Sequence, residues 1–177
     1  MALLVVLVAI HSARTPEQAV VTGIVAACFG SLLPVGYVLY QVRRRRLSDV
    51  HVGVRSQRPL VLLVALASVL VGLALLLWLG APRQLLGLVI AGITGIVVCL
   101  AVSTRWKLSI HLAVAAGTAV LIAYTFTPWC LLLLLLTIAV GWARLRLGDH
   151  TVSQVVAGAL LGGLIAAVVY PVIVFAS

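Results

Sequence analysis

Acidic residues are nearly absent from this 177-residue chain, which has three Asp and Glu against 12 Lys and Arg. The three acids are Glu17, Asp49 and Asp149, and each lies in a different segment. Chemistry that requires a cluster of carboxylates, such as a two-metal site or an acid–base pair, is therefore excluded. No paired Asp motif is present to hold magnesium, which also argues against an aspartate-rich prenyltransferase.

Charged residues of either sign are scarce too, at 8% of the chain, whereas 64% is hydrophobic and the mean hydropathy is +1.32. A soluble domain carries about a quarter charged residues and less than half apolar ones. The solvent of this chain is therefore a lipid bilayer.

Cys28, Cys99 and Cys130 each lie in an apolar run without a CxxC pattern. We interpret them as small core hydrophobes, which excludes a disulfide scaffold and a metal site.

The apolar runs predict an all-α membrane bundle of six transmembrane helices. The predicted spans are residues 19–42, with a bend at Pro34, and residues 60–79, 85–103, 111–127, 129–143 and 152–175. Residues 2–10 rise only about 14 Å, too little for a roughly 30 Å hydrocarbon core, and predict a short, half-inserted N-terminal helix. No linker separates these segments, so residues 1–177 are expected to form a single transmembrane domain. The oligomeric state is left open.

The cations lie mostly on one side of this predicted bundle. Of the 12 Lys and Arg, all except Arg14 and Arg83 fall in the three loops after the first, third and fifth spans. The positive-inside rule makes this face cytoplasmic and predicts a multi-pass protein of the cell membrane. Because the cations lie against the membrane, they suit lipid headgroups as partners and not nucleic acid.

The same three loops hold three of the four histidines, each near a cation or a hydroxyl. Their candidate site residues are His51, Arg55 and Arg58; Lys107, Ser109 and His111; and Arg144, His150 and Gln154. Converging cations with few acids favour an anion, and a phosphate fits best. Histidine in such a site is suited to act as a nucleophile or a general acid. Cations at span ends also serve as topology signals or headgroup contacts, and this alternative stays open.

The loops resemble the three signatures of the type-2 phosphatidic acid phosphatase (PAP2) superfamily, written K-x6-R-P, P-S-G-H and S-R-x5-H-x3-D. This chain has His51-x6-Arg58-Pro59, Leu108-Ser109-Ile110-His111 and Ala143-Arg144-x5-His150-x3-Gln154. The signatures frame residues 51–154, and the spans between them extend the resemblance over most of the chain.

The resemblance implies a phosphatase that uses neither metal nor cofactor and acts on a lipid or polyprenyl phosphate or diphosphate. His150 would attack phosphorus to give a phosphohistidine, and His111 would protonate the leaving oxygen. The implied phosphate-binding residues are His51, Arg55, Arg58, Lys107, Ser109 and Arg144. Fixed cations of this kind neutralise charge in the transition state.

The chain departs from the family pattern at several positions. His51 stands for the lysine of the first signature, Ala143 for the serine of the third, and Gln154 for its aspartate. A glutamine oxygen can accept an N–H bond from His150, four residues earlier, but cannot stabilise an imidazolium by charge. Alternatively, Gln154 bonds across a helix interface formed by Gly158-x3-Gly162.

Other glycines in the spans are interpreted as packing positions; these are Gly92, Gly95 and Gly117.

Two alternative functions remain open at this point. One is a prenyl diphosphate-processing enzyme without a phosphoenzyme, and the other is a non-catalytic lipid-phosphate-binding protein on a PAP2 scaffold. A transporter is disfavoured, because the spans carry no internal charge.

Overall fold

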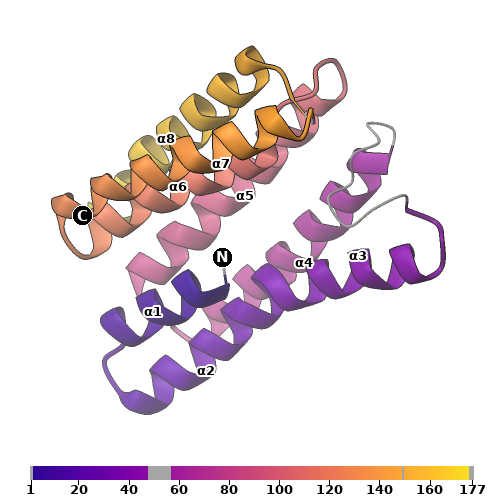
Figure 1. The fold of residues 1–177 in the computed structure, drawn as a ribbon. Coiled ribbons are helices and arrows are strands. Elements are labelled where there is room, and N and C mark those ends of the chain that lie inside the picture. The colour runs from indigo at the N-terminus through magenta and orange to yellow at the C-terminus, as the bar shows by residue number, and fades with distance from the viewer. Residues whose placement is uncertain (1, 48–56, 149, 176–177) are drawn as a thin grey trace.

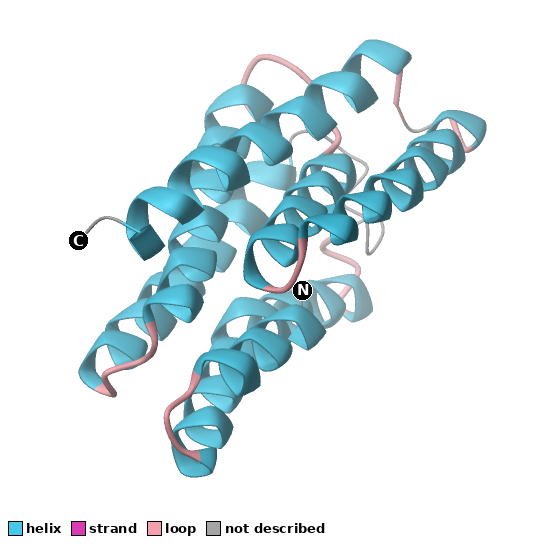
Figure 2. Cartoon of the chain, turned by 90° about the vertical axis from the view of Figure 1, so that its left-hand side faces the viewer, coloured by secondary structure: helices cyan, strands magenta, loops and turns pink. Residues whose placement is uncertain are grey.

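The computed structural model describes residues 2–47, 57–148 and 150–175, and the regular elements in these ranges are helices (Figure 2). In chain order they are α1 (Ala2–Ser12), α2 (Pro16–Ala27), a π-helical turn η1 (Cys28–Leu32), α3 (Leu33–Arg43), α4 (Arg58–Trp78), α5 (Arg83–Ser103), α6 (Ile110–Thr125), a 3₁₀ turn η3 (Pro128–Leu133), α7 (Leu134–Arg146) and α8 (Val152–Phe175). The predicted all-α class is confirmed for the described residues.

Five helical segments are long and apolar enough to cross a membrane. They are Pro16–Arg43, Arg58–Trp78, Arg83–Ser103, Pro128–Arg146 and Val152–Phe175. The expected span at 111–127 is the 16-residue helix α6, which rises about 24 Å and falls short of a roughly 30 Å core. The predicted count of six is therefore not confirmed. The short N-terminal helix is present as α1, and its buried face packs on α2 and α5.

The first long segment runs from α2 through η1 into α3, with a π-helical turn immediately before Pro34. A proline in a helix lacks an N–H donor and its ring crowds the carbonyl one turn earlier, so a wider turn relieves the clash. The freed backbone is satisfied from α4, because Ser68 Oγ donates a hydrogen bond to the Phe29 carbonyl at 2.8 Å. Phe29 also lies against Gly72 of α4.

Helix α5 joins the two sides of the molecule. Helices α1 to α4 lie on one side of it and α6 to α8 on the other, and α5 crosses between them (Figure 1). A buried core of Leu76, Leu85, Leu88 and Tyr170 connects α4, α5 and α8. At the end away from the three cationic loops, the Tyr170 and Thr125 hydroxyls are hydrogen-bonded at 2.9 Å, which ties α8 to the last turn of α6.

Glycines bring α6 and α8 into backbone contact. A Cβ at Gly158 would meet the Ser109 carbonyl oxygen, and one at Gly162 would meet the Ala113 carbonyl oxygen. From the other helix, a Cβ at Gly117 would lie 3.1 Å from the Gly162 carbonyl oxygen. The interpretation of these three glycines as close-packing positions is confirmed. Helices approach this closely only when small residues line the contact.

Helix α3 ends in a turn that places an arginine in the left-handed region. Arg45 has φ of 55°, and its N–H donates to the Val42 carbonyl while the Arg46 N–H donates to the Gln41 carbonyl, both at 2.9 Å. This is the Schellman pattern, in which glycine normally takes the left-handed position. Helix α4 ends in the same way but with Gly80, φ 63°, at that position.

We expect Arg45→Gly to raise the free energy of unfolding by about 1 kcal/mol, because a left-handed conformation costs an L-residue about 1–2 kcal/mol. The measurement is the thermal unfolding midpoint of the purified protein in detergent. Gly80→Ala is the matched control and should lower the midpoint, since it creates the same strain in the second turn. An Arg45→Gly midpoint at or below that of the parent would contradict this reading of the turn.

Candidate functional site

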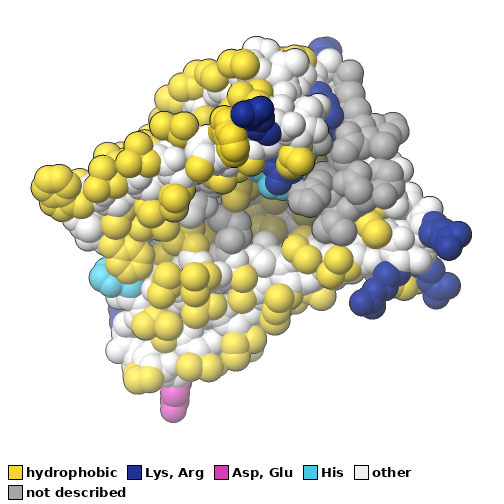
Figure 3. Space-filling model, viewed as in Figure 1, with side chains coloured by type: hydrophobic (Ala, Val, Ile, Leu, Met, Phe, Trp, Pro, Cys, Tyr) yellow, Lys and Arg dark blue, Asp and Glu magenta, His cyan; other side chains and the backbone are white. Residues whose placement is uncertain are grey.

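The described parts of the three cationic loops lie at one end of the molecule. They follow α3, α5 and α7, and Lys and Arg side chains gather mainly at this end (Figure 3). The described cations of these loops are Arg43 to Arg46, Arg58, Arg105, Lys107, Arg144 and Arg146. His51 and Arg55, predicted to bind phosphate, lie outside the described residues, as do Asp49 and Asp149.

Arg58 connects the first signature to the second. It begins α4, only 6% of it is exposed, and its Nη1 donates to the Leu108 carbonyl at 3.2 Å. A guanidinium has five N–H donors, and one of them makes this bond to the Leu108 carbonyl. Burial of a permanent cation is costly unless anionic or polar groups surround it. Arg58 therefore places positive charge against the segment that carries Ser109 and His111.

Ser109 is fully buried at the N-cap of α6. Its backbone N–H donates to the Gln154 carbonyl of α8 at 3.2 Å, so the second and third signatures are in direct contact. An N-cap serine usually accepts a hydrogen bond from the first turn of its own helix, but this side chain makes no such bond. Within the described residues the Ser109 hydroxyl has no partner at all. Buried polar groups nearly always have a hydrogen-bond partner, so this hydroxyl is a candidate for contact with a ligand.

Gln154 closes the start of α8 as one half of a capping box. The Thr151 N–H donates to Gln154 Oε1 at 3.2 Å, and the Gln154 N–H donates to Thr151 Oγ1 at 3.4 Å. This is the reciprocal pattern that a Thr-x-x-Gln sequence makes at a helix N-terminus. The Gln154 side chain therefore stays on its own helix, and only its backbone carbonyl bonds across to α6.

The same Oε1 atom lies 3.3 Å from Nδ1 of His150. The Thr151 N–H can donate only to the oxygen of the Gln154 amide and not to its NH2 group. The capping bond therefore identifies the amide atom at this position as Oε1. An oxygen opposite Nδ1 requires that Nδ1 carry the proton. In a neutral imidazole this leaves the lone pair on Nε2, the state in which a histidine acts as a nucleophile. The predicted contact between Gln154 and His150 is thus present in the structure.

The remaining predicted residues surround this contact at the same end of the bundle. His111 lies in the first turn of α6, two residues after Ser109, and both His111 and His150 are half-buried. Lys107, just before the segment bonded by Arg58, and Arg144, in the last turn of α7, are also half-buried. These hydrogen bonds connect Arg58, through the Leu108 carbonyl, to the segment of Ser109, and Ser109 to Gln154 and His150. Three further residues are near these in sequence. Lys107 and His111 flank Ser109, and Arg144 precedes His150 by six residues.

Neighbouring cations have other partners. Arg146 lies over the ring of Trp142, with 5.3 Å from its guanidinium carbon to the ring centroid, and Arg44 lies over Tyr40 at 5.4 Å. These cation–π contacts hold both arginines at the membrane boundary. Among the described residues, no three His, Cys, Asp or Glu side chains come together as a set of metal ligands.

Residues 102–176 match the family model of the PAP2 superfamily. No curated protein and no solved structure matches the chain significantly. The matched region covers α6, α7 and α8 and contains the second and third signatures, whereas the first signature precedes it.

Over these residues the chain is similar to the PAP2 superfamily, in agreement with the resemblance of its signatures. Members of this superfamily are generally phosphatases, and the long apolar helices are those of a multi-pass membrane protein. The match therefore suggests a phosphatase-type membrane protein. Two features of the site were not predicted. Thr151 was overlooked although the Thr-x-x-Gln capping pattern is visible in the sequence, whereas the Arg58 bond to the Leu108 carbonyl has no sequence signal.

Proposed function

We propose that the protein is a lipid phosphatase that hydrolyses a lipid or isoprenoid phosphate or diphosphate through a phosphohistidine on His150. The observation that carries the proposal is the contact of Gln154 Oε1 with His150 Nδ1, which leaves Nε2 as the nucleophilic atom. Ser109, whose fully buried hydroxyl has no partner among the described residues, and the buried Arg58 lie at the same end of the bundle. These are groups that a phosphate satisfies.

The reaction follows from these groups in two balanced steps. His150 Nε2 forms a bond to phosphorus while the bond from phosphorus to the lipid oxygen breaks, and that oxygen takes a proton from His111. Water then attacks the phosphohistidine and gives a proton to His111, and the nitrogen–phosphorus bond breaks to release orthophosphate. Each step needs an in-line arrangement and neutralisation of the equatorial oxygens, with proton transfer by a positioned imidazole.

Binding of the equatorial oxygens is assigned to the cations and the serine. Arg58, Lys107, Arg144 and Ser109 supply N–H and O–H donors, and His51 and Arg55 add charge from the first loop. No carboxylate pair or metal enters the scheme, in keeping with the three acidic residues of the whole chain. The uneven distribution of cations supports a site at the cytoplasmic face of the cell membrane, where the substrate is a membrane lipid.

The test is phosphate release by the purified full-length protein in detergent with EDTA present. The panel contains phosphatidate, lysophosphatidate, polyprenyl monophosphate and farnesyl diphosphate. Release of orthophosphate from at least one of these lipids is the expected result. Release of diphosphate with a rearranged prenyl product would overturn the hydrolase in favour of a diphosphate-processing enzyme. Tight binding of the lipids without release of either product would overturn it in favour of a binding protein.

Substitution of Gln154 tests its two roles separately. Gln154→Glu keeps the capping geometry and adds a negative charge beside His150. We expect kcat to rise about tenfold, because a hydrogen bond with a charged partner is worth about 1.5–3 kcal/mol. Gln154→Ala removes both the cap and the orienting oxygen, and we expect lower kcat and a loss of about 1 kcal/mol in stability. Steady-state kinetics and thermal midpoints measure these effects. A glutamate variant no faster than the alanine variant would contradict the orienting role.

A further inference from the structure

Four consecutive arginines, Arg43 to Arg46, form an exposed cationic surface where α3 ends. Lys and Arg side chains gather over this end of α3 in Figure 3, which has the view of Figure 1. Arg44 lies over the Tyr40 ring, and within the described residues the other three guanidinium groups have no hydrogen-bond or ion-pair partner. None of the four belongs to the three signatures of the candidate site. We call residues 43–46 the arginine turn.

The arginine turn is held in one conformation by the residues around it. The Gln41 carbonyl accepts hydrogen bonds from the Arg46 N–H at 2.9 Å and from the Leu47 N–H at 3.3 Å. Leu47 is buried in a cluster with Val38, and Val61 of α4 packs against this cluster. The turn is therefore fixed to both α3 and α4, and its charges are presented from a preformed surface.

Arg45 takes a conformation that glycine adopts more easily. Its φ is 55°, and the corresponding position after α4 is occupied by Gly80, with φ of 63°. A charge that served only as a topology signal would need no particular backbone conformation and could stand at an unstrained neighbouring position. Strain that persists in a folded protein points to a function of the strained residue. The function indicated here is one that uses the Arg45 charge in the finished fold.

The arginine turn lies at the depth of the lipid headgroups. The segment that it ends, Pro16–Arg43, has 28 residues and rises about 42 Å. This length exceeds the roughly 30 Å hydrocarbon core and matches the roughly 40–45 Å of a bilayer with its headgroups. Leu39 and Tyr40 are exposed on the last turns of α3, so the lipid-facing surface of the helix continues up to the arginines. The nearest partner for these charges is therefore the membrane and not a soluble protein.

We propose that the arginine turn binds the phosphate groups of anionic phospholipids, at a site separate from the candidate active site. A guanidinium group donates paired N–H bonds to phosphate oxygens, and it is the side chain best suited to this geometry. Four of them on one turn match several neighbouring headgroups of an anionic leaflet. The inference does not depend on the proposed hydrolysis, because a phosphodiester lipid without a terminal phosphate is a sufficient ligand.

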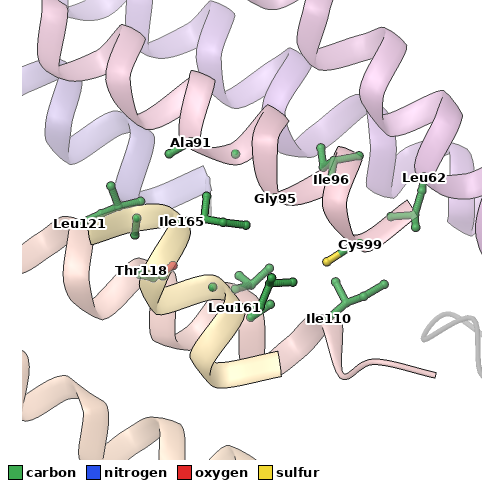
Figure 4. Close-up of a pocket in the computed structure, with 16 residues that line it drawn as sticks. Leu62, Ala91, Gly95, Ile96, Cys99, Ile110, Thr118, Leu121, Leu161 and Ile165 are labelled. Atoms are coloured by element: carbon green, nitrogen blue, oxygen red, sulfur yellow. The ribbon is translucent and has the colours of Figure 1, made fainter. Parts of the chain in front are cut away.

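The apolar interior of the protein does not distinguish lipids by charge. A cavity of about 110 Å³ between α4, α5, α6 and α8 is lined by apolar residues together with the Thr118 hydroxyl and the Cys99 thiol (Figure 4). Gly92 and Gly95 also line it, and a Cβ at either would have no heavy atom within 4 Å, so their interpretation as packing positions is wrong. Two lipids with the same acyl chains and different headgroups therefore isolate the contribution of the arginine turn.

The experiment measures displacement of fluorescent phosphatidylglycerol from the purified full-length protein in mixed micelles. The competitors are dioleoyl phosphatidylglycerol, which is anionic, and dioleoyl phosphatidylcholine, which is zwitterionic. We expect the parent to prefer phosphatidylglycerol, and the preference to weaken at high salt. Arg45→Gly should lower it about fivefold, the equivalent of about 1 kcal/mol for an arginine near an anionic surface, and should also raise the thermal midpoint in lipid-free detergent.

Three further variants separate charge from fold. Arg43→Gln leaves the left-handed position unchanged and should lower the preference to a similar extent. Arg45→Lys keeps the charge and should keep most of the preference. Arg105→Gln is the matched control, because it removes an exposed cation of the α5–α6 loop that lies outside the arginine turn, and it should match the parent.

Three results would overturn the inference. They are a parent without preference for phosphatidylglycerol, an Arg45→Gly variant with the parent's preference, and an Arg105→Gln variant that loses as much as Arg45→Gly. His150→Ala should retain the full lipid preference whether or not the protein hydrolyses phosphate. Release of phosphate by a parent that binds both competitors equally would refute the lipid site and leave the proposed function intact.

Discussion

His150→Ala is expected to abolish phosphate release, lowering kcat by about a thousandfold or more, the loss typical of a removed covalent nucleophile. The structure gives the physical reason. Gln154 Oε1 accepts from Nδ1 of His150, so Nε2 is the unprotonated atom that would bond to phosphorus. The measurement is orthophosphate release in EDTA from the best lipid of the panel.

His111→Ala provides the contrast that separates the two histidines. A general acid is needed when the leaving oxygen is a basic alkoxide and not when it is a stable phenolate. His111→Ala should therefore lose activity on lipid phosphates and retain most of it on p-nitrophenyl phosphate, whereas His150→Ala should lose both. Acid-quenched samples with labelled substrate should contain phosphoprotein in the parent and none in His150→Ala. Near-parental release by His150→Ala would refute the phosphohistidine mechanism.

Gly162→Leu should prevent assembly of the bundle, with a loss of at least about 3 kcal/mol in the free energy of unfolding. A Cβ at this position would meet the Ala113 carbonyl oxygen and would lie 2.5 Å from its carbonyl carbon and 2.6 Å from its Cα. Backbone atoms cannot rotate away as a flexible side chain can, so α6 and α8 would have to separate. Even Gly162→Ala should lower the thermal midpoint clearly.

The adjacent Gly163 supplies a matched control. A Cβ there has no heavy atom within 4 Å, so Gly163→Ala should leave stability unchanged or raise it slightly. The yield of folded protein in detergent and its thermal midpoint distinguish the two positions. Separation of α6 from α8 would also break the bond from the Ser109 N–H to the Gln154 carbonyl, so Gly162→Ala should lose activity together with stability. Equal behaviour of the two alanine variants would contradict the close contact.

The sequence by itself determined the solvent, the helical class and the resemblance to the PAP2 superfamily. A chain that is 64% hydrophobic, with its charges confined to short segments, must satisfy its backbone within helices inside a bilayer. The spacing of Arg144, His150 and Gln154 is a local property of the chain, and the contact of His150 with Gln154 follows from residues four apart at one helix start. These features depend on composition and on neighbours in sequence.

Only the tertiary structure decided what the glycines do and where the buried charge lies. Gly92 and Gly162 are the same residue in similar apolar helices, yet a Cβ at Gly92 would have no heavy atom within 4 Å and one at Gly162 would meet the backbone of a neighbouring helix. Likewise, no pattern in the chain pairs Arg58 with the Leu108 carbonyl, 50 residues away. Such contacts depend on which helix faces meet, and helix packing is set by the shapes of both partners at once, so neither sequence segment determines it alone.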